Sequence, residues 1–98
     1  MKITKAQQKF LRNKVHHLKP VIWIGQNGLT ENVTVEIETA LDHHELIKIK
    51  LQPGDKTLRD KTIKDICQTT RSVNIQRIGN IVSIYRRNDR QPVIKLPK

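Results

Sequence analysis

The sequence predicts a small α/β domain whose helices pack mainly on one face of a sheet. Three segments with apolar residues at helical spacing alternate with four short apolar segments, in the order α-β-α-β-α-β-β. Segment 46–51 alternates: one side carries Ile47, Ile49 and Leu51, and the other carries Leu46, Lys48 and Lys50. A strand covered on both faces would not carry two lysines on one side, so we expect one open face.

The first helix is expected from Lys5 to about His17. Thr4 and Gln7 have the spacing of a capping box, in which each side chain bonds the main chain of the other residue. Apolar residues fall mostly on one side of this helix, and we expect that side to pack. The opposite side carries cations and no acidic residue: Lys5, Lys9, Arg12 and His16.

Pro20 ends the first helix, because the residue before a proline is pushed toward extended geometry. The apolar run 21–24 that follows is predicted to be a short buried strand. Trp23 lies in this apolar run and could stack on a base, but such a tryptophan more often packs in the core, where we expect it. Tyr85 is left open between these two roles. A second helix is expected from Glu31 to about His43, with Thr30 as its N-cap.

The second half of the chain predicts a helix and a hairpin. After the Pro53-Gly54 turn, Asp55 can cap a helix that ends near residue 70. Segments 73–78 and 81–86 are predicted strands, because Gly79-Asn80 between them is typical of a tight hairpin turn. Residues 88–98 are expected to form a basic extended tail lying against the domain.

Positive charge is concentrated at the two ends of the chain. Of a net charge of +10, residues 1–20 supply six basic residues and no acid, and residues 71–98 supply seven basic residues and one acid. Such a distribution is typical of a polyanion-binding protein. A single cysteine excludes an internal disulfide. Without an apolar leader or a run of ~18 apolar residues, we expect a cytoplasmic protein and no membrane partner.

The loop Gly25-Gln26-Asn27-Gly28 joins a predicted strand to a predicted helix. Glycine lets another molecule approach the main chain, and the first turn of a helix offers unpaired N–H groups to an anion. In so basic a chain, the expected anion is a nucleic-acid phosphate. The loop lacks the Gly-Lys-Ser/Thr ending and the third glycine of nucleotide-binding loops, so we expect no cofactor and no small-molecule substrate.

The histidine pairs 16–17 and 43–44 are weak candidates for a metal or catalytic site. Adjacent helical residues point about 100° apart, so neither pair chelates one ion easily, and no cysteine pair completes a set. A histidine beside Glu45 could act as a base, but no nucleophile or oxyanion donor accompanies it. We expect no metal, no catalytic residue and no enzyme.

The chain resembles the CRM domain family, and more narrowly its stand-alone bacterial YhbY-type members, over nearly its whole length. The resemblance rests on four motifs in order: Lys19-Pro20-Val21, segment 24–30, segment 44–50, and Ile78-Gly79 leading to Tyr85-Arg86. It implies one CRM-type domain over residues 1–98. The implied fold is that of the C-terminal domain of translation initiation factor 3, with a four-stranded mixed sheet whose last strand is antiparallel.

The resemblance also implies an RNA-binding function. Bacterial members associate with precursors of the large (50S) ribosomal subunit, which implies ribosomal RNA as partner and a role in ribosome assembly. The loop of this family is compared with that of KH domains, which clamps RNA backbone. Many relatives carry Lys or Arg after the first glycine, where this chain has Gln26, so we expect the loop to bind through main-chain N–H groups alone.

We expect cations outside the loop to supply most of the affinity for RNA, and the protein to act as a monomer. A protein–protein adaptor on assembling particles remains an alternative, and an RNA-processing enzyme a weaker one. Since the chain has few aromatic residues, we expect it to recognise RNA shape. A Gly28→Asp change is expected to abolish loop contact and leave the fold intact. The expected cations are Lys5, Lys9, Arg12, Lys48, Lys50, Arg86, Arg87 and Arg90.

Overall fold

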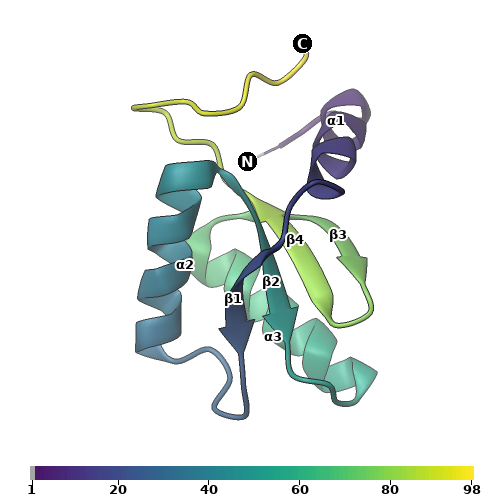
Figure 1. Cartoon of the computed structure of the whole chain (residues 1–98), viewed down its shortest axis with the longest axis vertical. Coiled ribbons are helices and arrows are strands. Elements are labelled where there is room, and N and C mark those ends of the chain that lie inside the picture. Colours follow the sequence, from purple (N-terminus) through teal and green to yellow (C-terminus); the bar gives the residue numbers. More distant parts are fainter. Residues whose placement is uncertain (1) are drawn as a thin grey trace.

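The computed structural model describes residues 2–98 and contains three helices and four strands within that range (Figure 1). The predicted order is confirmed, and the ends of the predicted elements agree to within two residues. Their bounds are α1 (Lys5–Val15), β1 (Pro20–Ile24), α2 (Glu31–His44), β2 (Leu46–Leu51), α3 (Lys56–Thr70), β3 (Val73–Ile78) and β4 (Ile81–Tyr85).

The four strands form one mixed sheet in the order β1-β2-β4-β3. β1 and β2 run parallel because α2 carries the chain back between them, whereas β4 is antiparallel to both of its neighbours. The two-residue turn Gly79-Asn80 joins β3 to β4, and Gly79 has φ +58°, which favours glycine. The mixed sheet and the hairpin are both confirmed.

Side chains at the predicted caps begin all three helices. In the capping box of α1, the Gln7 N–H donates to Thr4 Oγ1 (3.1 Å), and the Thr4 N–H donates to Gln7 Oε1 (3.0 Å). Thr30 Oγ1 accepts from the Val33 N–H at 3.2 Å. Asp55 caps α3 in the same way. Each cap provides an acceptor for an N–H group that the helix leaves unpaired.

Helices α2 and α3 cover one face of the sheet and enclose the larger hydrophobic core. This core is entirely aliphatic, and each fully buried side chain contributes about 1.5–3 kcal/mol. All five isoleucine and leucine side chains on this face of β1 and β2 belong to it. Its buried members are Ile22, Ile24, Ile37, Leu41, Ile47, Ile49, Leu51, Ile63, Ile66, Val82 and Ile84.

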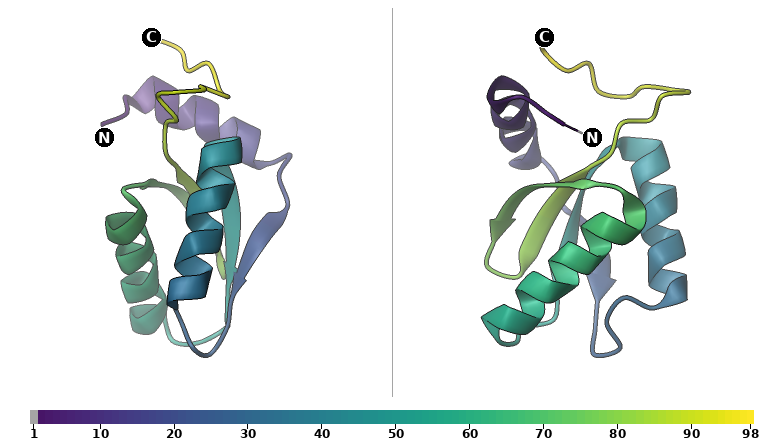
Figure 2. Two further views of the ribbon diagram at one scale, coloured as in Figure 1. Left: turned by 90° about the vertical axis from the view of Figure 1, so that its left-hand side faces the viewer. Right: turned by 180° about the vertical axis from the view of Figure 1, so that it is seen from behind.

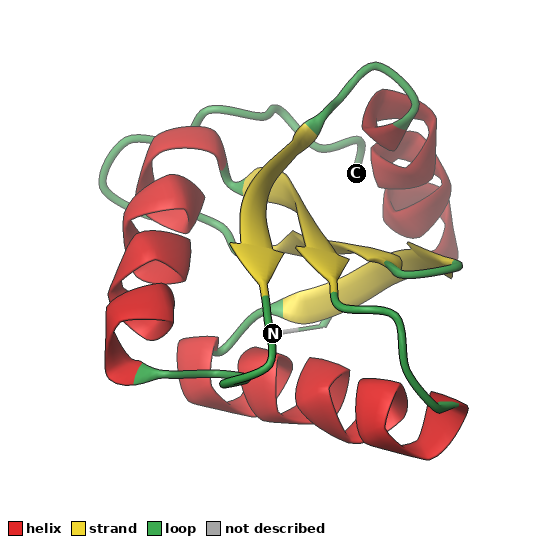
Figure 3. Ribbon diagram, turned by 60° about the horizontal axis from the view of Figure 1, so that its bottom comes forward, coloured by secondary structure: helices red, strands yellow, loops and turns green. Residues whose placement is uncertain are grey.

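Helix α1 packs on the opposite face, at one end only. Leu11 and Val15 form a second core there with Leu46, Ile75 and Tyr85. Figure 3 shows the sheet lying between this helix and the other two. On the rest of the face Trp23 and Ile78 are exposed and Lys48 is half-buried, so the expected open surface is the part that α1 does not reach.

The tail that follows β4 is held in place by one buried carboxylate. Glu45 is fully buried, and its side chain accepts from the main-chain N–H groups of Asn88 (2.6 Å), Val93 (2.8 Å) and Ile94 (2.6 Å). Ile94 also packs against the α1 core. Figure 2 shows the tail crossing above the end of α2 on its way to α1. Glu45, considered above as a partner for a catalytic histidine, is an anchor of the fold.

Candidate nucleic-acid interface

The glycine loop is a tight turn with an exposed tip. The Gly28 N–H donates to the Gly25 carbonyl (3.1 Å), and the Thr30 N–H donates to the Gly28 carbonyl (3.0 Å). Gly25, Gln26 and Asn27 are exposed. Within residues 2–98, the N–H groups of Gln26 and Asn27 have no hydrogen-bond partner. The loop therefore presents two neighbouring main-chain donors to solvent.

The two glycines of the loop differ in backbone conformation, and only Gly28 has a positive φ. Gly28 has φ +68°, a left-handed conformation that costs other L-residues about 1–2 kcal/mol. Gly25 lacks a positive φ, and a Cβ atom built on it would meet nothing within 4 Å. The folded chain itself does not require glycine at position 25. An exposed, unshielded main chain at this point leaves room for another molecule.

The start of α2 is not the anion site that the sequence suggested. Thr30 already caps the helix through the Val33 N–H, and the Thr34 N–H donates to the Thr30 carbonyl at 2.9 Å. Glu31 places a carboxylate in the first turn, where it offsets the positive end of the helix dipole. An incoming phosphate would meet a like charge there. The available donors are those of the loop.

The loop forms one wall of a cleft of about 260 Å³, whose other walls are the turn between β2 and α3 and the first turns of α3. The Gln52 N–H donates to the Ile24 carbonyl at 2.9 Å and ties this turn to the base of the loop. Arg59 of α3 lines the cleft, with its Nη1 donating to Asn80 Oδ1 at 3.0 Å. Its buried Nε has no partner among residues 2–98.

Arg59 is a cation that the sequence reasoning missed. A loop with Gln26 supplies no positive charge, whereas Arg59 brings one to the same cleft from a different element. Asp55 also lines the cleft, where its carboxylate caps α3 by accepting from the Leu58 N–H at 2.8 Å. A signal for Arg59 was present, because the loops that follow two adjacent parallel strands leave the sheet at the same edge.

Trp23 is 63% exposed, and its expected place in the core is wrong. β1 is an edge strand, and its alternate residues Ile22 and Ile24 fill the core beneath α2. Trp23 therefore points to the opposite face, where α1 packs only at the far end. Tyr85 shares that face but lies under α1 and is 1% exposed, so it is not a surface for stacking.

The phenol of Tyr85 is buried in an apolar setting. Burial raises the pKa of Tyr85, and the negative charge of Glu45 raises it further. Its hydroxyl oxygen has no hydrogen-bond partner among residues 2–98. The neutral phenol is the form that suits this position.

The open face of the sheet carries the two predicted lysines. Lys50 is exposed and pairs in register with Trp23, whereas Lys48 is half-buried one row closer to α1. None of the four strands contains an acidic residue. The face is therefore positive and partly apolar.

The predicted cations of α1 lie far from the loop. Lys5, Lys9 and Arg12 are all exposed. Figure 1 shows α1 and the glycine loop at opposite ends of the long axis of a molecule that measures 38 Å in that direction. A ligand that reached both would have to run the length of the protein.

Arg86 does not present its charge to solvent. Its Nη1 lies 2.6 Å from Glu38 Oε2 and donates to the Thr70 carbonyl, and its Nη2 lies 2.9 Å from Asp42 Oδ1. Its side chain is 19% exposed. The predicted phosphate contact of Arg86 is replaced by a bond network that joins the ends of α2 and α3 to the tail. We leave Arg86 out of the interface.

The remaining predicted cations of the tail are exposed but lie near acids. Arg87 Nε lies 3.4 Å from Asp89 Oδ1. Arg87 and Arg90 both line a shallow hollow that Asp42 and Asp89 also line. The positive charge expected at this end is therefore offset locally.

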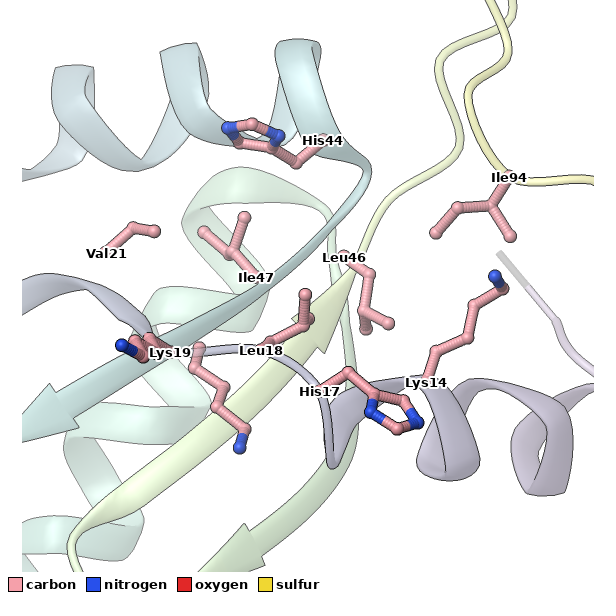
Figure 4. A pocket seen from close by; sticks show the side chains of 10 residues that line it. Lys14, His17, Leu18, Lys19, Val21, His44, Leu46, Ile47 and Ile94 are labelled. Atoms are coloured by element: carbon pink, nitrogen blue, oxygen red, sulfur yellow. The ribbon is translucent and has the colours of Figure 1, made fainter.

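A hollow of about 380 Å³ lies where α1, β1 and the end of α2 meet (Figure 4). Its apolar floor includes Leu18, Val21 and Ile94, and its rim carries only basic or histidine side chains among its polar groups. The sequence could not reveal this hollow, because residues far apart in the chain build it. The rim consists of Lys14, His17, Lys19, His44 and Lys48.

No group of three or more His, Cys, Asp or Glu side chains within residues 2–98 is placed to hold a metal ion. No helix in the same range is long and apolar enough to cross a membrane.

The sequence profile of the CRS1 / YhbY (CRM) domain matches residues 3–86. The chain belongs to the CRM domain family. A relative from Haemophilus influenzae, named "RNA-binding protein", is 42% identical over 98% of this chain and 96% of its own length. The Bacillus subtilis protein named "Probable RNA-binding protein YqeI" is 32% identical over 97% of this chain and 99% of its own length. Both names describe RNA-binding proteins and neither names an enzymatic activity.

A solved structure supports the same assignment of this CRM domain. The solution structure of a hypothetical protein from Staphylococcus aureus covers 98% of this chain and 100% of its own, with a TM-score of 0.82 and 30% identity. The match to the CRM profile ends at residue 86, so it includes the loop, the open sheet face and Arg59. The tail held by Glu45 lies beyond it.

Proposed function

We propose that this CRM domain binds RNA, and that the glycine loop holds one stretch of its phosphate backbone. The observation that carries the proposal is the exposed pair of main-chain donors at Gln26 and Asn27, beside the cation of Arg59. Gln26 and Arg59 both line the cleft, and Asn27 is the neighbour of Gln26 at the exposed tip of the loop. Main-chain N–H groups and a guanidinium near one another suit the oxygens of a phosphate. The names of two relatives support RNA as the ligand.

The cations outside the loop would supply most of the affinity. Lys50 and Lys48 extend the positive surface from the loop along the open face, and the exposed lysines and arginine of α1 continue it at the far end. Contacts to phosphate add affinity without reading sequence. If six phosphates were neutralised, the binding constant would fall about a thousandfold between 50 and 200 mM salt.

We further propose that the RNA is ribosomal RNA in precursors of the large (50S) ribosomal subunit, and that the protein acts in ribosome assembly in the cytoplasm as a monomer without catalytic activity. The resemblance to stand-alone bacterial family members supports this part. A tagged chain should sediment with precursor particles of the large subunit rather than with small subunits. An even distribution over both subunits would count against an assembly role.

The loop is tested with Gly25→Val, which adds bulk where the fold leaves open space. Losing one charge-assisted hydrogen bond to phosphate costs about 1.5–3 kcal/mol, so affinity for a fragment of precursor ribosomal RNA should fall at least about tenfold. Filter binding at constant salt measures this, and thermal unfolding verifies the fold. Unchanged affinity in a folded variant would remove the loop from the interface.

The open face is tested with a matched pair of lysines. Lys50→Gln removes a cation from the open face, and Lys64→Gln removes an exposed cation of α3 near Asp60 and Cys67 instead. Plots of log affinity against log salt should lose about 0.9 in slope for Lys50→Gln, with no change for Lys64→Gln. Equal slopes for both variants would contradict a contact at Lys50.

A further inference from the structure

The tryptophan of the chain lies exposed on the open face, two residues before the loop. A row across this face runs over all four strands, with Trp23 beside Lys50, then Ile81, then Ile78. Trp23 and Ile78 are 63% and 62% exposed, and they stand at the two edges of the sheet. With strands about 4.8 Å apart, the row is about 14 Å wide, which is wider than a nucleobase.

The fold gives no reason for an indole at position 23. The core beneath α2 is filled by Ile22 and Ile24, and Trp23 contributes nothing to it. An exposed large aromatic side chain is informative, because burial is the usual state of such a group. The indole is also next to a cation, since Lys50 is its register partner on β2.

We propose that Trp23 stacks on an unpaired RNA base, while Lys50 contacts a phosphate of the same stretch. This inference rests on the proposed RNA binding and deepens it. The loop would hold the backbone at the end of β1, and the base would turn onto the indole next to it. The ligand class is then RNA with an unpaired nucleotide, such as a bulge or a loop, rather than a continuous duplex recognised by shape alone.

Charge favours a nucleotide over a protein partner on this face. The four strands contain no acidic residue, and Lys48 and Lys50 cross the middle of the face. A stacked base brings its own phosphate to these lysines, and any base offers a π-face to an indole. Val21 is 48% exposed and lines the hollow of Figure 4, so the same surface leads from Trp23 toward α1.

The test uses two RNA probes that differ in one nucleotide. One is a duplex of twenty base pairs, and the other is the same duplex with a single-adenosine bulge. The chain has one tryptophan, so fluorescence excited at a wavelength that Tyr85 does not absorb reports on Trp23 alone. We expect the bulged probe to quench this fluorescence and to bind more tightly. Absence of quenching at saturation with the bulged probe would overturn the proposal.

Substitutions then assign the preference to the indole. Trp23→Ala should weaken binding of the bulged probe about 5- to 150-fold and bring it close to the plain duplex. Trp23→Phe should keep most of the preference, because phenylalanine still offers a ring. The control is Val35→Ala, which removes an exposed apolar side chain from α2, where 58% of Val35 is exposed.

The outcomes separate this inference from the proposed function. If Trp23→Ala binds both probes as tightly as the wild type does, while Gly25→Val still weakens both, stacking is overturned and backbone binding stands. If Trp23→Ala weakens both probes equally, the indole does not contact the unpaired base, and the proposal is wrong. Failure of the wild type to bind either probe would overturn both proposals.

Discussion

Replacing each loop glycine by alanine should change stability in opposite directions. At Gly25, a methyl group meets open space and an ordinary φ, so the main effect is a lower entropy of the unfolded chain. Such a change stabilises by about 0.4–1 kcal/mol. At Gly28, the same entropy gain is outweighed by a cost of about 1–2 kcal/mol for a left-handed alanine, because φ is +68°. We expect a net loss of about 1 kcal/mol there.

Thermal unfolding followed by circular dichroism can resolve this difference. In a domain of this size, 1 kcal/mol corresponds to about 4–8 °C in the melting temperature, so Gly25→Ala should melt several degrees above Gly28→Ala. Although Gly25→Ala should stabilise the fold, it should weaken RNA binding, because its methyl group lies where RNA is proposed to approach. If Gly25→Ala is as destabilising as Gly28→Ala, the fold itself requires Gly25, and this glycine is no evidence for a ligand.

The same backbone angle corrects the expectation for Gly28→Asp. Aspartate tolerates the left-handed region better than most residues, but it still carries a Cβ atom at φ +68°. A loss of RNA binding in that variant would mix strain in the loop with charge repulsion. Substitutions at position 25 separate these two effects.

Three further predictions concern the supports of the interface. Glu45→Gln replaces a charged acceptor of three N–H groups by a neutral amide and should destabilise the fold by about 2–4 kcal/mol in urea unfolding; a loss below about 1 kcal/mol would contradict its role as anchor. Arg86→Ala should cost about 2 kcal/mol and Arg87→Ala less than about 0.5 kcal/mol in the same assay, and equal costs would contradict the bond network. Tyr85→Phe removes a buried hydroxyl without a partner and should be neutral or stabilising. Because the folded chain raises the pKa of Tyr85, wild-type stability should fall as pH rises above about 10, and Tyr85→Phe should lack that fall.

The elements of the fold could be predicted because their signals are local. Capping residues three positions apart, alternation in β2 and a glycine turn between two strands each act over a few residues. From these signals the ends of the helices and strands were predicted to within two residues. The mixed sheet and its antiparallel last strand came instead from the resemblance to the family.

The environment of single side chains was harder to predict, because it depends on distant segments. Trp23 is exposed because α1 covers only one end of its face of the sheet. No local sequence pattern predicts which part of that face α1 packs against. Arg86 bonds Glu38, which lies 48 positions away in the chain, and Glu45 bonds the tail over similar separations. Charge counts cannot distinguish a cation held by such contacts from one that faces solvent. The lysines of β2 were placed correctly because alternation within one strand decides their face.

The position of the chain ends suggests how the protein can be attached to other molecules. Both ends of the described chain lie beside α1, and the glycine loop lies at the opposite end of the long axis (Figure 1). A surface linker or a fused partner joined at either end would therefore leave the loop at the far end of the molecule from the attachment.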